Sequence, residues 1–479
     1  MRQVERQQMQ FGQVGIERIR FNAKSRDDIP AILIGLQHLY ADENLRARLF
    51  AMLQEEVLPD RDHRTGRPGM ALWNILVLAV LKQGLGCDYD RLQELANEHR
   101  TVRRMLGHGD WTESEHEYQL QTLIDNVSLL SPEFLSKVSR LVVESGHEVA
   151  GKKPGAPLGG RCDSFVVETD VHHPTDVNLL WDSMRCLIRD SAKSAGRHGL
   201  CGWRQSAHLL NQTRRLFQRV NTTWRWRNEA RVGEYLKHCS KLIARSKDTL
   251  RQLQGLPCNT LLEEIRIENW LKHAERQREQ VERRLLKGEK IAHQDKVLSI
   301  FEPHTRWCRK GKAGVPVELG VPVCVVEDAF QFVLHHEILW QGSDVDAAVP
   351  VVENTQRRFA DFRMCSFDRG FHSPENRRRL DGLLDKNVLP RKGRWSRADR
   401  RRESCEEFVE ARRRHAAVES AINALEHRGL DRIRSRGAAG FERMVALSVL
   451  AANVHRLGVL LRNRHRDDQR CRKRSLRAA

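Results

Sequence analysis

The sequence predicts an α/β fold with an all-α region at its N-terminus, and three observations support this fold class. First, helical periodicity dominates the chain up to about residue 150. Second, the run 163–171 mixes β-branched, aromatic and acidic residues in the manner of a strand, which Pro174 ends. Third, the apolar segments 315–326 and 330–338 are joined by a short turn, as in a β-hairpin.

Residues 1–150 are expected to form a helical domain. The pattern predicts an accessory helix over 31–40 and a turn at Gly66-Arg67-Pro68-Gly69. Three short helices follow, at 71–83, 89–97 and 102–106. Tight turns between short helices are typical of a helix-turn-helix DNA-binding module. They fit a helical bundle used for dimerisation equally well, so both interpretations stay open.

Residues 151–160 are rich in Gly and Pro and are predicted to be a linker. A second domain is expected over 161–465, and the last residues, 466–479, form a basic C-terminal tail.

Within this second domain, residues 177–298 are long, helical and basic, and we expect a helical insertion there. Arg214 and Arg215 are candidate DNA contacts. Three tryptophans lie among the arginines, namely Trp203, Trp224 and Trp226. Aromatic rings among cations can stack on bases, although core packing is the more frequent role of a helical tryptophan.

The elements after this insertion have a recognisable order. The hairpin is followed by a helix over 344–359, a strand over 363–368, a helix over 374–384 and a short strand over 388–390. A helix over 415–425 then places Val418, Ala421, Ile422 and Leu425 on one face. Strand, hairpin, helix, strand, helix, strand and helix is the order of an RNase H-like core.

The chain of 479 residues has a formal net charge of +19, spread along its length. Such a charge predicts a polyanionic partner, with nucleic acid ahead of an anionic membrane. The apolar run 71–81 is too short to span a bilayer and contains Asn74, which argues against a membrane protein. Eleven scattered cysteines without a C-x-x-C pair predict reduced thiols in a cytoplasmic protein.

Carboxylates mark three of the predicted elements. On the first strand, Asp163 shares a face with apolar residues, while Glu168 and Asp170 share the other face. Asp368 precedes a Gly turn, and Glu419 lies at the margin of the buried face of its helix. Solvated acids on an edge strand would explain the first group alone, but not acids on three separate elements.

Several motifs occur in the order found in a known family. They are Gly66-Arg67-Pro68 with Leu106-Gly107, Asp163-Ser164 with Pro174-Thr175-Asp176, Lys310-Gly311-Lys312-Ala313 with Glu318-Leu319-Gly320-Val321, Asp368-Arg369-Gly370-Phe371, and Val418-Glu419 with Gly429-Leu430-Asp431-Arg432. With this ordered set the sequence resembles bacterial insertion-sequence transposases of the DDE type, close to the group not yet classified (ISNCY-like) and to related families. The resemblance covers about residues 66–441.

The resemblance implies a DNA transposase with an RNase H-like DDE catalytic domain over 161–465. Its catalytic and metal-binding residues would be Asp163, Asp368 and Glu419, with Asp170 as the alternative first ligand. Two Mg²⁺ ions, for which Mn²⁺ can substitute, would be bound by these hard oxygen ligands. Water would first free a 3′-hydroxyl at the element's end, and that hydroxyl would then attack target DNA.

The resemblance also implies partners and contacts. Terminal inverted repeats and target DNA are the expected partners, in a synaptic complex of at least a homodimer, within the bacterial cytoplasm near the nucleoid. Lys310, Lys312, Arg369 and His415 are the expected phosphate contacts.

The chain departs from the family around Glu419. Family members often carry Tyr and Arg before the catalytic Glu and Lys after it, whereas this chain has His415, Arg412 and Glu426. A metal-dependent endonuclease without strand transfer, and a silent DNA-binding relative, are the alternative functions.

Overall fold

The structure is a computed structural model that describes residues 13–22, 24–58, 69–109, 116–222, 229–257, 259–292, 295–309 and 317–478, with side chains up to 471. The chain divides into two compact units, one formed by residues 1–170 and 308–479 and the other by residues 171–307. Each unit is described by itself below.

The N-terminal part of the first unit consists of helices. They are η1 (Ile16–Arg18), α1 (Asp28–Ala41), α2 (Glu43–Val57), α3 (Leu72–Gly84), α4 (Tyr89–Glu98), α5 (Arg100–Met105), α6 (Leu120–Val127) and α7 (Pro132–Val149). Every residue of α3 is buried, including the polar Lys82 and Gln83. This helix therefore belongs to the hydrophobic core, and α4 and α5 keep exposed faces.

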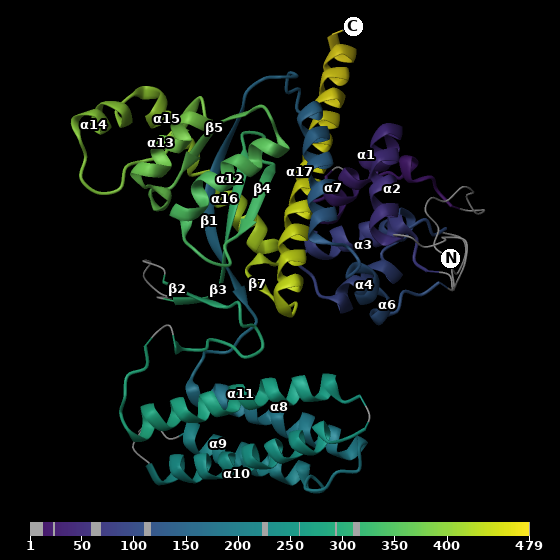
Figure 1. Ribbon diagram of the computed structural model, residues 1–479. Helices are drawn as coiled ribbons and strands as arrows, with labels where there is room; N and C mark the ends of the chain where they lie inside the picture. Colours follow the sequence, from purple (N-terminus) through teal and green to yellow (C-terminus); the bar gives the residue numbers. More distant parts are fainter. Residues whose placement is uncertain are drawn as a thin grey trace. The chain divides into compact units, whose positions relative to one another are not determined.

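The long helix α17 (Gly437–Ala478) organises these N-terminal helices. It packs along α1, α7 and α3 (Figure 1). A Cβ atom on Gly458 would lie 1.8 Å from the carbonyl oxygen of Ala31, and a Cβ on Gly35 would lie 2.3 Å from the carbonyl oxygen of Val454. Glycine at these two positions lets the backbones of α1 and α17 approach closely.

A mixed sheet forms the second layer of this unit. Among the described residues it contains seven strands, in the order β2-β3-β1-β5-β6, with β4 on β3 and β7 on β1. Their bounds are β1 (Leu158–Thr169), β2 (Arg306–Arg309), β3 (Val317–Asp328), β4 (Val333–Ile338), β5 (Phe362–Phe367), β6 (Lys386–Val388) and β7 (Arg432–Ile433). The central strand β1 is antiparallel to β3 and parallel to β5.

Helices cover both faces of the sheet. They are α12 (Asp344–Arg358), η4 (Arg369–Phe371), α13 (Pro374–Leu383), α14 (Arg397–Glu403), α15 (Glu406–His415), α16 (Val418–Leu425) and η5 (Glu426–Leu430). Cys162 and Cys324 share a buried cluster with α12, whereas Phe165 and Val167 share another with α16 and the first turns of α17. Alternate residues of β1 thus face opposite helices, as the pleat requires.

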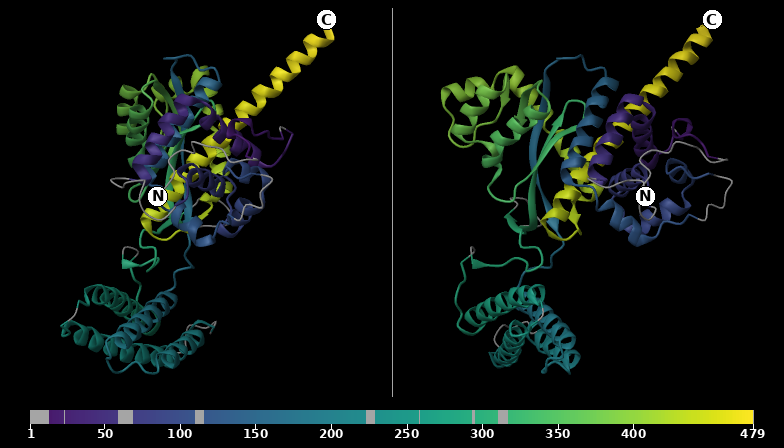
Figure 2. Two further views of the ribbon diagram at one scale, coloured as in Figure 1. Left: turned by 90° about the vertical axis from the view of Figure 1, so that its right-hand side faces the viewer. Right: turned by 45° about the vertical axis from the view of Figure 1, so that its right-hand side comes forward.

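The second unit consists of α8 (Asp176–Arg197), α9 (Ser206–Asn221), α10 (Glu229–Gln254), α11 (Leu261–Val281) and η2 (Glu282–Leu286). The four long helices lie side by side (Figure 2). They enclose a core of their own that includes Tyr235, Cys239 and Ile267. This part of the chain buries enough apolar surface to be a compact body.

Several predicted boundaries differ from the structure. The expected linker 151–160 overlaps β1, which begins at Leu158. The expected helix over 415–425 is wrong in one respect, because α15 ends at His415 and α16 begins at Val418. A turn separates the two helices, so His415 and Glu419 do not lie one turn apart on a single continuous helix.

The apolar helix α17 was not predicted from the sequence. Its described part Gly437–Cys471 is long and apolar enough to cross a membrane, but 61% of its most apolar window is buried inside the structure. A buried helix in the core of a soluble protein can have the same length and composition. The basic tail expected at 466–479 continues this helix to Ala478.

We predict that Gly458→Ala destabilises the protein by at least about 1–3 kcal/mol, because the added methyl group overlaps the backbone of α1. Gly382→Ala in α13 is the matched control, since a Cβ there meets nothing within 4 Å. Gly382→Ala should raise the free energy of unfolding by no more than about 1 kcal/mol. Urea unfolding of both variants measures the difference, and equal stabilities would contradict the close approach.

Candidate active site

Strand pairing brings two of the predicted acids together. Cys162 of β1 pairs with Phe367 of β5 in a parallel register. Asp163 and Asp368 are the next residues on these neighbouring strands, which lie roughly 5 Å apart. Both side chains point to the face opposite Cys162 and Phe367, so the first and second acids share one face, with Asp163 in the middle of β1 and Asp368 just beyond the end of β5.

The third acid reaches this face from α16. Val418, Ile422 and Leu425 are buried, and the last two pack in the same cluster as Phe165 of β1. Glu419, in the first turn, stays exposed beside this buried stripe. The apolar periodicity of the helix therefore fixes which side of it carries the carboxylate.

The pKa of the Asp163 carboxyl group reflects its burial and the nearby acids. Burial, together with the charges of Asp368, Asp344 and Glu419, raises the pKa of its carboxyl group to about 6, although a hydrogen bond lowers it in part. That hydrogen bond is donated by the backbone N–H of Ser164 to Oδ1 at 2.8 Å. A carboxyl pKa that is raised by burial and by neighbouring carboxylates is typical of catalytic and metal-binding sites.

Asp344 is the residue that sequence reasoning missed. It is the first residue of α12, and its Oδ1 accepts a hydrogen bond from Ser164 Oγ at 2.6 Å. The helix start was visible in the sequence from the Ser343 and Asp346 capping box. Nothing local indicated that this end of α12 would lie beneath β1.

The alternative first ligand, Asp170, lies elsewhere. It follows the last residue of β1, seven positions beyond Asp163, and forms an ion pair with Arg432 at 2.9 Å. At about 3.3 Å per residue, this places it more than 20 Å along the strand from Asp163. Glu168 lies at the same end, paired in register with Arg432 of β7.

Two basic residues border the acids. His415 hydrogen-bonds through Nδ1 to Ser366 Oγ at 3.0 Å, and burial lowers the pKa of its imidazole. Arg161 donates to the carbonyl oxygens of Asp328 and Arg414 and contacts Glu327 at 3.1 Å. It thereby ties β1 to the hairpin turn and to the end of α15.

The other predicted DNA contacts are placed as follows. Arg369 is exposed in η4, directly after Asp368. Arg214 and Arg215 are exposed on α9. Lys310 and Lys312 lie outside the described residues.

Of the three tryptophans in the predicted insertion, Trp203 lies among the described residues. Trp203 is buried in the second unit, donates from Nε1 to Thr249 Oγ1 at 2.8 Å and packs under Arg245. Core packing therefore accounts for it. Trp224 and Trp226 lie outside the described residues.

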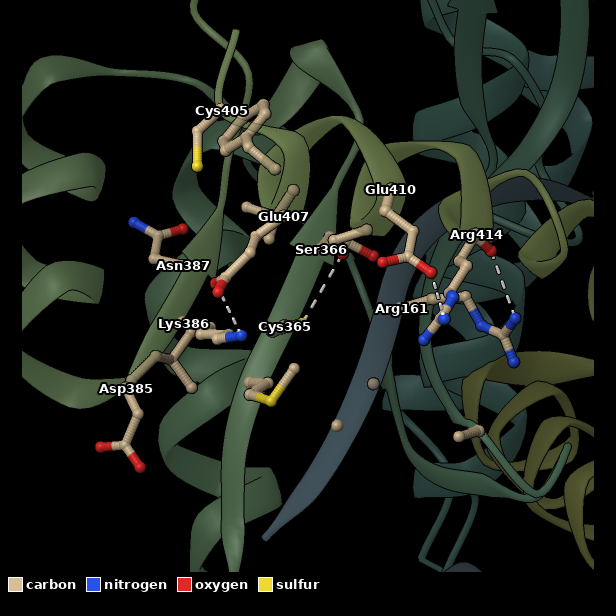
Figure 3. A pocket seen from close by; sticks show the side chains of 18 of the residues that line it. Arg161, Cys365, Ser366, Asp385, Lys386, Asn387, Cys405, Glu407, Glu410 and Arg414 are labelled. Atoms are coloured by element: carbon tan, nitrogen blue, oxygen red, sulfur yellow. Dashed lines mark hydrogen bonds and ion pairs between the residues drawn. The ribbon is translucent and has the colours of Figure 1, made fainter. Parts of the chain in front are cut away.

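A cavity of about 1010 Å³ opens on the acid-bearing face, between β5, β6 and α15. Arg161 and Ser366, two residues before Asp163 and Asp368, belong to its lining (Figure 3). The cations around it are paired, including Lys386 with Glu407 at 2.8 Å and Arg414 with Glu410. Paired cations leave little net charge for binding phosphate in the cavity itself.

The donor set suits a hard cation. Carboxylate oxygens are the ligands that Mg²⁺ prefers, and the mutual repulsion of these acids would be relieved by bound positive charge. Within the part of the chain that the structure describes, however, no group of three His, Cys, Asp or Glu side chains is arranged closely enough to hold a metal ion.

We predict that Asp163→Asn stabilises the metal-free protein, increasingly so between about pH 4 and pH 6. In the wild type the unfolded carboxyl ionises near its usual pKa of 3.8, whereas the folded one ionises near pH 6. Ionisation of Asp163 therefore lowers the free energy of unfolding of the wild type as pH rises, by up to about 3 kcal/mol above pH 6. Asn does not ionise, so the variant does not lose this stability.

Urea unfolding in a chelator at pH 4, 5, 6 and 7.5 measures this difference. Asp170→Asn is the control, since it removes only an exposed ion pair and should change stability by less than about 1 kcal/mol. A stability difference for Asp163→Asn that does not vary with pH would contradict the raised pKa of Asp163.

Comparison with known proteins completes the site. Residues 292–454 match the family model described as the transposase DDE domain. This range contains Asp344, Asp368 and Glu419, while Asp163 joins them from outside it through the sheet. No curated protein and no solved structure matches the chain significantly. Residues 292–454 thus match a transposase DDE domain, and this match supports a DDE transposase of the insertion-sequence type.

Proposed function

We propose that the protein cleaves DNA at the ends of an insertion sequence and joins those ends to target DNA, with Asp163, Asp368 and Glu419 as its catalytic and metal-binding residues. The observation that carries this proposal is the parallel register of β1 and β5, which sets Asp163 beside Asp368. The charge of Glu419 acts on the same carboxyl group of Asp163.

The topology supports an RNase H-like core. The first strand β1 is central, the hairpin β3-β4 lies antiparallel on one side, and β5 and β6 follow in parallel on the other. In this arrangement the middle of the first strand, the end of the parallel strand and the last helix converge. These are the three positions that carry the acids of this chain.

The chemistry follows from the donor set. Divalent metal ions are used by transposase DDE domains in general, and we propose Mg²⁺, with Mn²⁺ able to substitute, held by Asp163, Asp368 and Glu419. When bound, such ions would activate a hydroxyl nucleophile and stabilise the leaving oxygen. We propose that Arg369 and His415 contact the phosphate, because Arg369 is exposed beside Asp368 and a hydrogen bond between Nδ1 of His415 and Ser366 Oγ orients the imidazole.

DNA is the partner that a transposase implies. We propose that the exposed arginines of α9 contact its phosphates, because Arg214 and Arg215 lie on the outer surface of the second unit. Joining two element ends would also require at least two copies of the protein in one complex.

We predict that Asp368→Asn abolishes cleavage of duplex DNA carrying an insertion-sequence end, because Asn cannot supply an anionic ligand. End binding should persist within about threefold, since the site carboxylates repel phosphate. Asp170→Asn is the matched control and should retain cleavage. A Mg²⁺ titration after chelation, followed by gel analysis of the products, measures both effects.

The products distinguish the alternatives. Cleavage without joined products, under conditions where binding is saturated, would favour a metal-dependent endonuclease. Full activity of Asp368→Asn would contradict the proposed site, and inactivity of the wild type together with tight binding would favour a silent DNA-binding relative.

We predict that DNA affinity falls steeply with salt and that replacing both Arg214 and Arg215 by Ala lowers the slope of log K against log[salt] by about 2. Arg251→Ala is the control, because Asp248 already pairs with that exposed arginine at 2.6 Å. Fluorescence anisotropy between 50 and 200 mM salt measures the slopes. An unchanged slope in the double variant would remove α9 from the DNA interface.

A further inference from the structure

Asp344 contacts the segments that carry two of the proposed catalytic acids. Its Oδ1 accepts the hydroxyl hydrogen of Ser164, the residue next to Asp163, at 2.6 Å. The backbone N–H of the same serine donates to Asp163 Oδ1 at 2.8 Å. Ser164 therefore connects the two carboxylates, with one polar group directed to each.

The other oxygen of Asp344 lies against the turn that carries Asp368. A Cβ atom on Gly370 would be 3.1 Å from Asp344 Oδ2. Because Gly370 has no side chain, it leaves room for this carboxylate. Asn376 strengthens the same junction, because its Nδ2 donates to the carbonyl oxygens of Val345 and Phe371. The start of α12 is thus fastened to η4 as well as to β1.

The position of Asp344 in its helix suits a fixed negative charge. It is the first residue of α12, where the free backbone N–H groups favour an anion. The capping box of Ser343 and Asp346 holds this turn in place, with Asp346 accepting from the backbone N–H of Ser343 at 2.8 Å. The carboxylate is therefore presented from a rigid helix end.

Asp344 acts from the opposite face of the sheet. Ser164 alternates with Asp163 along β1, so its side chain points toward α12 while Asp163 points toward α16. A carboxylate beneath the strand can orient the residues above it without touching the substrate.

We propose that Asp344 is a positioning residue, which acts through Ser164 and the turn at Gly370 to orient the segments bearing Asp163 and Asp368 toward a divalent cation. The inference rests on the proposed function of the same site. Groups that orient metal ligands in this way typically change metal affinity by 10–100-fold when removed.

The test measures Mn²⁺ binding to the full chain by electron paramagnetic resonance, with cleavage as a second readout. Asp344→Ala should raise the Kd for Mn²⁺ by roughly 10–100-fold. Asp344→Asn keeps an acceptor for the Ser164 hydroxyl and should recover most of this loss. Ser164→Ala should resemble Asp344→Ala, and the double variant should be little worse than either, as expected for one shared interaction.

Asp346→Ala is the matched control. It removes the capping carboxylate of the same helix turn and lowers stability, but it should change the Kd for Mn²⁺ far less than Asp344→Ala does, because Asp346 bonds to Ser343 and Asp344 bonds to Ser164. A merely structural role of Asp344 would make Asp344→Ala and Asp346→Ala alike in both stability and Mn²⁺ binding, which would overturn the proposal.

Two further outcomes are distinguishable. If Asp344→Asn loses Mn²⁺ as completely as Asp344→Ala and Asp163→Asn, Asp344 is itself a ligand and the positioning role is wrong. If Asp163→Asn leaves both Mn²⁺ binding and cleavage intact, the proposed function of the site fails, whatever Asp344 does.

Discussion

The register of β1 between β3 and β5 is the constraint on which the site depends. Phe165 and Val167 are buried against α16 and α17, and Cys162 is buried against α12. A shift of one residue would exchange these faces and carry Asp163 to the wrong side of the sheet. The apolar residues of β1 thus fix the direction of its acid, and core packing and active-site geometry are set by the same alternation.

The N-terminal helices belong to the same core as the sheet. Asn453, buried in α17, bonds to the backbone N–H and C=O of Val333 and to Ser139 Oγ, so one amide joins α17, β4 and α7. The glycines at the crossing of α1 and α17 bring a further helix close to this junction. The N-terminal helices and the sheet therefore lie in one compact unit, which includes residues 1–170 and 308–479.

The site retains an unfavourable charge arrangement in a protein that is otherwise strongly basic. Asp163 is partly buried and lies among the charges of Asp368, Asp344 and Glu419. Such a cluster lowers folding stability unless cations neutralise it, and it persists because rigid elements hold each acid in place. Function and stability therefore have opposite electrostatic requirements at this point of the fold.

The sequence by itself determined the elements, because apolar periodicity and turn residues act locally. It predicted the first strand, the hairpin, the order of elements after it and the stripe on α16 beside Glu419. Tertiary structure decided the rest. Only the pairing of β1 with β5 shows that Asp163, and not Asp170, lies beside Asp368. The break between α15 and α16 follows from how these helices pack. The role of Asp344 becomes visible only because α12 lies beneath β1. These are contacts between residues far apart in the sequence, 180 positions for Ser164 and Asp344 and 205 for Cys162 and Phe367, which no local pattern contains.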